Sequence, residues 1–176
     1  MTPLIDTLNF VLATGGLVLL GTIAFLVFDY KRDRALQPLV KDWGMHIAFL
    51  MALGGSAMTL VYSDVFGFVP CGLCWLQRVF LYPQVFLIGT SMYLRDKVFG
   101  PFYGIILSSL GLIIALYQHY LQMGGLDIAG CPTTGEHTDC AERILFEYGF
   151  MTFPLLSAIM FLFLIVLYWY YRGVAD

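Results

Sequence analysis

Four cysteines, arranged as two close pairs, are the side chains of this chain best suited to covalent chemistry. Cys71 and Cys74 have two residues between them in VPCGLCWLQR, and Cys131 and Cys140 have eight between them in CPTTGEHTDC. A disulfide stabilises a fold mainly by closing a long loop, so the first pair would be a poor structural link. Exposed, short-loop pairs are typical of thiol–disulfide exchange instead. We therefore interpret the cysteines as redox-active.

Two other interpretations are compatible with the spacing. In one, both pairs are stable disulfides that hold loops in a non-catalytic membrane scaffold or a transporter subunit. In the other, the cysteines and His137 bind zinc, which takes thiolate and imidazole ligands. Structural disulfides should resist mild reductant, and a zinc protein should purify with stoichiometric metal. We expect no metal site, because zinc favours closed sites built from reduced thiolates.

Charged residues stand close to both pairs. Cys74 and Arg78 are four residues apart, so they share one face of a helix if that helix has begun by Cys74. A neighbouring cation or a helix N-terminus stabilises a thiolate. In the second pair, Asp139 followed by Glu142 resembles a capping box. This pattern predicts a helix in which Cys140 occupies the first position, where the helix dipole favours a thiolate.

The composition of the whole chain is that of an integral membrane protein. It is 60% hydrophobic and 12% charged, whereas soluble domains are about 45–50% apolar and about 25% charged. A net charge of −3 is too small to indicate a nucleic-acid partner. Five apolar segments reach the length of about 20 residues that a bilayer requires: 8–28, 43–62, 75–94, 102–121 and 153–171. We therefore predict an all-α integral membrane fold in a single domain, 1–176.

The distribution of lysine and arginine predicts how these spans are oriented. Basic residues gather in the loop 29–42, in the short loop after Leu94 and in the C-terminal tail, which places these parts in the cytoplasm. The N-terminus and the loops 63–74 and 122–152 then lie outside, with every cysteine among them. The residues before the first apolar segment include no lysine or arginine, which predicts a retained helix rather than a signal peptide.

Ionisable residues inside a membrane span are costly and indicate function. Arg78 and His119 lie near the outer ends of their predicted spans, at the depth of the cysteines. His46 begins its span at the opposite side, about 20 Å away in depth from His119, which disfavours a haem held by these two histidines. Electrons taken from thiols need an acceptor, and a lipid-soluble quinone is the natural one in a bilayer. Arg78 and His119 are suited to stabilise its carbonyl oxygens as charge develops there.

Three sequence motifs resemble those of the disulfide bond formation protein B family, which includes DsbB and its BdbC-like relatives. PCGLCWLQR followed by YP resembles the first redox motif of that family, YQHY its histidine near a helix end, and CPTTGEHTDCAERILFEYGFMTFP its second cysteine pair. The resemblance implies a four-helix transmembrane bundle over 43–171, and the additional N-terminal transmembrane helix predicted at 8–28 is a departure from the family. With the spans and the charge distribution given above, we predict five spans, an outside N-terminus, a cytoplasmic C-terminus and an extracytoplasmic redox loop at 122–152.

The same resemblance implies a function in the cytoplasmic membrane of a bacterium. The expected protein is a membrane thiol:quinone oxidoreductase that reoxidises a soluble DsbA- or BdbD-like thioredoxin-fold oxidase and so supports disulfide formation in exported proteins. Cys131 is expected to form a mixed disulfide with this partner, after which Cys140 attacks Cys71. Cys74 then passes electrons to the quinone.

The resemblance also carries over the residues expected at the quinone. Arg78 matches the quinone-interacting arginine of the family, and His119 matches a residue near the quinone ring. Ubiquinone and menaquinone both remain possible acceptors, and the resting disulfides are either 71–74 with 131–140 or a rearranged 71–140 pair. The short spacing of the second pair resembles the BdbC-like branch. The quinone-linked vitamin K epoxide reductase family has its two cysteine pairs in the opposite order.

Overall fold

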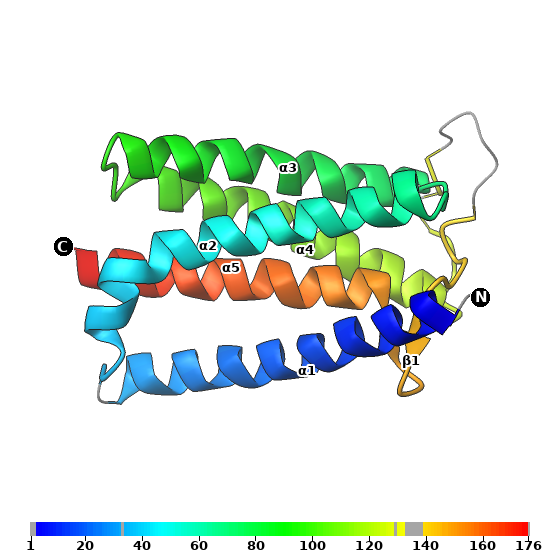
Figure 1. The fold of residues 1–176 in the computed structure, drawn as a ribbon, viewed down its shortest axis with the longest axis horizontal. Coiled ribbons are helices and arrows are strands. Elements are labelled where there is room, and N and C mark those ends of the chain that lie inside the picture. Colours follow the sequence, from blue (N-terminus) through cyan, green and yellow to red (C-terminus); the bar gives the residue numbers. More distant parts are fainter. Residues whose placement is uncertain (1–2, 33, 129, 133–138, 176) are drawn as a thin grey trace.

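The computed structural model describes residues 3–32, 34–128, 130–132 and 139–175, most of which lie in long helices (Figure 1). The helices are α1 (Pro3–Lys31), α2 (Gln37–Leu60), α3 (Gly72–Tyr93), α4 (Phe99–Gln122) and α5 (Phe153–Ala175). A short π-helical stretch, η1 (Val61–Val65), continues α2, and two short strands, β1 (Phe146–Glu147) and β2 (Met151–Thr152), precede α5. The helices run side by side along the long axis, and the chain begins and ends at opposite ends of the bundle.

The predicted all-α membrane fold is confirmed, because each predicted span coincides with one of these helices. Among the described residues, α1, α2 together with η1, α4 and α5 are long and apolar enough to cross a membrane. The 22-residue α3 is not in that group, although the sequence analysis treated it as an equivalent span. It carries Gln77, Arg78 and Gln84, which are all buried in the bundle. These polar side chains face the protein rather than the lipid, so α3 completes the bundle with a mixed interior face.

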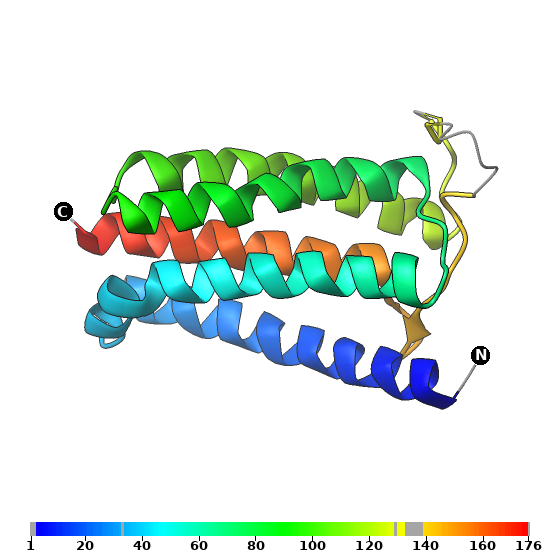
Figure 2. The ribbon, with the colours of Figure 1, turned by 45° about the horizontal axis from the view of Figure 1, so that its top comes forward.

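The helix α5 occupies the centre of the fold. It packs against α1, α2 and α4, while α3 packs against α2 and α4. Its side chains Phe161, Leu164 and Tyr168 are fully buried. A Cβ atom on Gly111 of α4 would overlap the ring of Phe161, so this glycine lets α4 and α5 approach closely. The four helices α2–α5 therefore form the bundle, and both views place α1 along its edge (Figures 1 and 2).

Polar contacts attach α1 at both of its ends. At the end where α1 joins α2, Asp29 accepts a hydrogen bond of 2.6 Å from Tyr170 Oη and two more from backbone amides of the following loop. At the other end, the buried Asn9 accepts a bond of 2.6 Å from Tyr62 Oη and donates one of 3.3 Å to the carbonyl of Ile144. Asn9 thus links α1 both to η1 and to the segment that precedes β1.

The helix predicted to begin at Asp139 is absent from the described residues, and the capping-box interpretation is wrong. Asp139 instead accepts a hydrogen bond of 2.9 Å from the amide of Ala141 within a turn. The chain then forms the antiparallel hairpin of β1 and β2. Tyr148 and Gly149 at its tip have φ angles of 54° and 75°, which a right-handed helix does not allow. Cys140 therefore lies in a turn rather than at a helix N-terminus.

We predict that Asn9→Leu weakens the attachment of α1. The substitution leaves the Tyr62 hydroxyl and the Ile144 carbonyl without their partner in a buried place, which costs about 1–3 kcal/mol. The thermal unfolding midpoint in detergent should fall, and limited proteolysis near residue 144 should become faster. Thr22→Val is the matched control, since Thr22 is exposed and bonds only within α1. An Asn9→Leu protein as stable and as protease-resistant as Thr22→Val would contradict this role.

Candidate redox site at one end of the bundle

Both cysteine pairs lie at the end of the bundle where α3 begins. Cys71 is the N-cap residue of α3 and Cys74 lies in its first turn, while Cys131 and Cys140 belong to the connection from α4 to α5. All four side chains pack in one apolar cluster that is separate from the main core. Its other members are Leu73, Ile114, Tyr117 and Leu121. The fold thus brings together two pairs that are about sixty residues apart in the sequence.

The inner pair consists of two free thiols in close contact. The Sγ atoms of Cys71 and Cys74 are 2.8 Å apart, and the backbone amide of Cys74 lies 3.4 Å from Cys71 Sγ. The Cys71 thiol donates a hydrogen bond to Cys74 Sγ, which raises the pKa of Cys71, and burial raises it further. A single negative charge on the pair is therefore favoured at Cys74, which lies one helical turn from Arg78.

The outer pair is a disulfide. Cys131 and Cys140 are joined with their Cα atoms 5.9 Å apart, which is within the usual range for disulfides. The structure therefore has the 131–140 disulfide but neither the 71–74 nor the 71–140 disulfide, so it matches only the outer half of the first arrangement that the sequence leaves open. Among the described residues, no group of three His, Cys, Asp or Glu side chains is placed to hold a metal ion. His137, from the zinc interpretation, lies outside the described residues.

A backbone contact holds the outer pair against the inner one. A Cβ atom on Gly72 would overlap the carbonyl group of Pro132, the residue that follows Cys131. Only glycine allows the chain to lie so close to the first turn of α3. Gly72, which directly follows Cys71, is therefore the point at which the redox loop contacts α3.

The end of α4 holds the other side of the redox loop. Gln122 Nε2 donates a hydrogen bond of 2.6 Å to the carbonyl of Glu142, and Arg143 Nε donates one of 2.5 Å to the carbonyl of Gln122. These bonds fix the turn that follows Cys140. The outer disulfide is thereby held between α3 on one side and α4 on the other.

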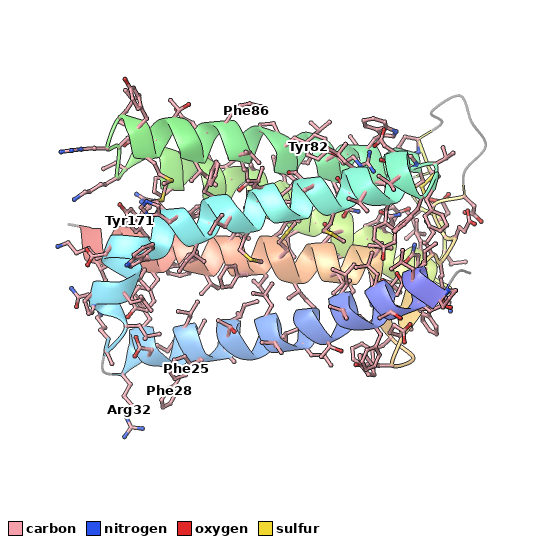
Figure 3. The ribbon with its side chains drawn as sticks, viewed as in Figure 1. Phe25, Phe28, Arg32, Tyr82, Phe86 and Tyr171 are labelled. Atoms are coloured by element: carbon pink, nitrogen blue, oxygen red, sulfur yellow. A yellow bond between two sulfur atoms is a disulfide. The ribbon has the colours of Figure 1, made fainter. Side chains whose placement is uncertain are left out.

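Arg78 lies inside the protein rather than extending to the membrane surface. Its side chain is 8% exposed, and its Nη2 atom donates a hydrogen bond of 2.8 Å to the carbonyl of Thr59 on α2. Its guanidinium carbon lies 5.1 Å from the centre of a Trp75 ring. Both residues line a cavity of about 290 Å³. The other lining residues are Leu60, Ser63, Asp64, Phe68, Val69, Pro70 and Tyr82, of which Tyr82 is labelled in Figure 3.

His119 has a different neighbourhood. Its Nδ1 atom lies 2.9 Å from Thr152 Oγ1 at the end of β2, so the contact that the structure gives this side chain is toward α5. The cavity that Arg78 lines does not include it. His46 lies next to the ring of Trp43 near the start of α2, at the far end of the bundle. The structure therefore joins Arg78 to the inner pair through α3 but does not bring His119 into the same cavity.

Two glutamines that the sequence analysis did not select belong to the site. Gln118 contacts the sulfurs of the inner pair directly, and Gln77 contacts Gln118. Gln118 Nε2 lies 3.1 Å from Cys71 Sγ and 3.2 Å from Cys74 Sγ. Gln77 Nε2 donates a hydrogen bond of 2.6 Å to Gln118 Oε1. Neither residue is ionisable, but a neutral amide in an apolar span is also costly to bury. An amide within an apolar span is therefore the sequence signal that marks both residues.

The sequence model of the family described as "Disulfide bond formation protein DsbB" matches residues 41–171. The SPbeta prophage-derived disulfide bond formation protein B of Bacillus subtilis (strain 168) is 38% identical over 118 residues, which cover 65% of this chain and 76% of that protein. No solved structure matches the chain.

Two further relatives match this chain over most of their own length. The probable disulfide formation protein C 2 of Bacillus anthracis is 30% identical over 131 residues, 74% of this chain and 91% of that protein. A probable disulfide formation protein of Chlamydia caviae is 34% identical over 123 residues, 69% of this chain and 86% of that protein. The helix α1 precedes the residues matched by the family.

We predict that Gly72→Ala loosens the redox loop. The added methyl group would overlap the Pro132 carbonyl, so residues 130–132 must move away from α3. The Cys131–Cys140 disulfide should then react several-fold faster with a small reductant, measured by thiol labelling and mass spectrometry. Gly54→Ala is the control, since nothing lies near its Cβ position. Equal reduction rates in both variants would show that the close approach does not protect the disulfide.

Proposed function

The chain belongs to the disulfide bond formation protein DsbB family, whose members form disulfides at the membrane, and we propose that it is a thiol:quinone oxidoreductase. In this proposal it reoxidises a soluble thioredoxin-fold oxidase of the DsbA or BdbD type. The observation that carries the proposal is the single cluster that contains both cysteine pairs, together with a cavity lined by Arg78 and by Pro70 and Trp75, the chain neighbours of Cys71 and Cys74. A scaffold with structural disulfides would not need the inner pair as free thiols.

The first exchange takes place at the outer disulfide. A thiolate of the reduced partner attacks Cys131 Sγ, the bond to Cys140 breaks, and its electron pair leaves on Cys140 Sγ. The Cys140 thiolate attacks Cys71 of the oxidised inner pair, so the Cys71–Cys74 bond breaks and Cys74 becomes the thiolate. The packing of all four cysteines in one cluster supports this order, because it shortens the path of each attack.

Two further exchanges complete the transfer. The second thiolate of the partner attacks the partner's own sulfur in the mixed disulfide, which releases Cys131 and leaves the partner oxidised. The Cys131 thiolate then attacks Cys140, restores the outer disulfide and releases Cys71. Two electrons and two protons have then moved from the partner dithiol to the inner pair. The oxidised outer pair and reduced inner pair of the structure correspond to this stage.

The cavity lined by Arg78 fits a quinone headgroup by its chemistry. Its walls include the aromatic rings of Phe68, Trp75 and Tyr82, and its volume of about 290 Å³ is near the lower end of ligand sites. Arg78 has five N–H donors, and its bond to the Thr59 carbonyl leaves others to face the cavity. A bound quinone supplies an acceptor for two electrons and two protons. Arg78 would bind one carbonyl oxygen and stabilise negative charge there.

Charge distribution supports an outward-facing redox end. The opposite end of the bundle carries Lys31 and Arg172 in the last turns of α1 and α5, and Arg95 follows α3. Arg32, labelled in Figure 3, lies at this end as well. By the positive-inside rule this end faces the cytoplasm. We therefore place the two cysteine pairs on the extracytoplasmic side of the bacterial cytoplasmic membrane, where the soluble partner is found.

The proposal predicts quinone reduction that depends on both pairs. Purified protein in detergent would be given a reduced thioredoxin-fold oxidase as donor, and the loss of quinone absorbance would be followed with ubiquinone and menaquinone analogues. Cys74→Ala and Cys131→Ala should each lower turnover by at least about 1000-fold, because each removes a sulfur through which every electron pair must pass. Failure of the unmodified protein to reduce either quinone with this donor would overturn the proposal.

Arg78→Lys tests the assignment of the cavity. Lysine keeps the positive charge but lacks the planar fork that can bind Thr59 and a ligand together. The KM for the quinone should rise about tenfold, equivalent to about 1.4 kcal/mol, while exchange between the partner and Cys131 keeps its rate. Arg172→Lys is the control, because Arg172 also lies over an aromatic ring but at the other end of the bundle. An unchanged KM in Arg78→Lys would remove Arg78 from the quinone site.

A further inference from the structure

The side-chain amide of Gln118 faces both sulfur atoms of the inner pair. Its Nε2 atom lies 3.1 Å from Cys71 Sγ and 3.2 Å from Cys74 Sγ, and those two sulfurs are 2.8 Å apart. An amide nitrogen carries two N–H groups, so one can point at each sulfur. Gln118 is 1% exposed, so water does not compete for these contacts. A donor thus stands next to both atoms between which the disulfide forms and breaks.

The amide can face the sulfurs with its nitrogen because its oxygen is already bound. Gln77 Nε2 on α3 donates a hydrogen bond of 2.6 Å to Gln118 Oε1 on α4. If the Gln118 amide turned over, its oxygen would face the sulfurs and two N–H donors would face each other. Gln77 is itself 8% exposed, so its own donor has little access to water. The two glutamines therefore hold one orientation of the amide.

From this geometry we propose that Gln118 is a catalytic residue of the inner pair and that Gln77 positions it. The proposal rests on the exchange reaction given above. When Cys140 attacks Cys71, the Cys71–Cys74 bond breaks and its electron pair moves to Cys74 Sγ. Gln118 stabilises that developing thiolate by donating an N–H to it. When Cys71 is the leaving sulfur in a later exchange, the second N–H does the same there.

The hydrogen bond from Gln118 stabilises the thiolate more than the disulfide. Such a difference between two states is what catalysis and a change of redox potential require. A hydrogen bond to a thiolate is charge-assisted and about twice as strong as one to a neutral sulfur. The amide therefore stabilises the reduced, charged pair more than the disulfide, and so makes the pair a stronger oxidant. This is the direction needed to draw electrons from the outer pair.

Gln118 and Arg78 act from different sides of the inner pair. Arg78 contacts α2 through the Thr59 carbonyl and lines the cavity assigned to the quinone. Gln118 approaches from α4 and is not among the residues that line that cavity. Loss of Gln118 should therefore change the redox equilibrium of the thiols without changing the affinity for the quinone.

Gln118→Met in the full-length protein tests the proposal, because methionine is similar in shape but has no donor. The protein in detergent would be equilibrated with glutathione buffers in the absence of partner and quinone, and the redox state of Cys71 and Cys74 read by alkylation and mass spectrometry. We expect the inner pair to become about tenfold harder to reduce, or about 30 mV more negative in potential. Gln77→Met should shift the equilibrium in the same direction by a smaller factor.

Gln84→Met is the matched control. Gln84 is a fully buried glutamine of α3 that bonds Ser108 and Tyr168 and no sulfur, so its loss should lower stability but leave the thiol equilibrium unchanged. An unchanged equilibrium in folded Gln118→Met, or an equal shift in Gln84→Met, would overturn the proposal. If Gln118→Met does not fold, Gln77→Met decides by the same criterion. This equilibrium contains no quinone or partner, so its result does not depend on the overall reaction. Failure of the overall reaction would be detected in the quinone-reduction assay instead.

Discussion

The contact between Gly72 and Pro132 is the constraint on which the site depends. It places the backbone that follows Cys131 directly on the first turn of α3, which no larger residue than glycine allows. The bonds from Gln122 and Arg143 hold the far side of the same loop to the end of α4. Two cysteine pairs far apart in the sequence thereby share one apolar cluster. Thiol–disulfide exchange between the two pairs then requires new sulfur–sulfur bonds but no large movement of the chain.

In the apolar surroundings of the site, a few polar side chains determine how the helices are joined. An apolar bundle offers no water to a buried amide, so each amide must find its partner in another helix. Gln77 and Gln118 join α3 to α4 at the sulfurs, and Asn9 joins α1 to the segments that flank the redox site. The helix that lies outside the family match is thus tied to the parts of the chain that carry the cysteines.

The sequence was sufficient for the five helices, the two cysteine pairs and the position of Arg78 one helical turn from Cys74, because length, hydropathy and helical spacing are local properties. It failed at the segment after Cys140, where a capping pattern predicted a helix. There the positive φ angles at Tyr148 and Gly149 and the pairing of β1 with β2 decide for a hairpin. The contact of Gln118 with the sulfurs depends on how α4 is rotated against α3, which single-sequence spacing does not specify.

The central claim is that electrons pass from the outer pair to the inner pair, and a titration without quinone tests it most directly. Fully oxidised protein would receive one equivalent of reduced thioredoxin-fold oxidase, followed by acid quenching, thiol alkylation and peptide mass analysis. The account predicts alkylated Cys71 and Cys74 with an intact Cys131–Cys140 disulfide, the arrangement found in the structure. Alkylated Cys131 and Cys140 with an intact Cys71–Cys74 disulfide would contradict it, because the inner pair would then not receive the electrons.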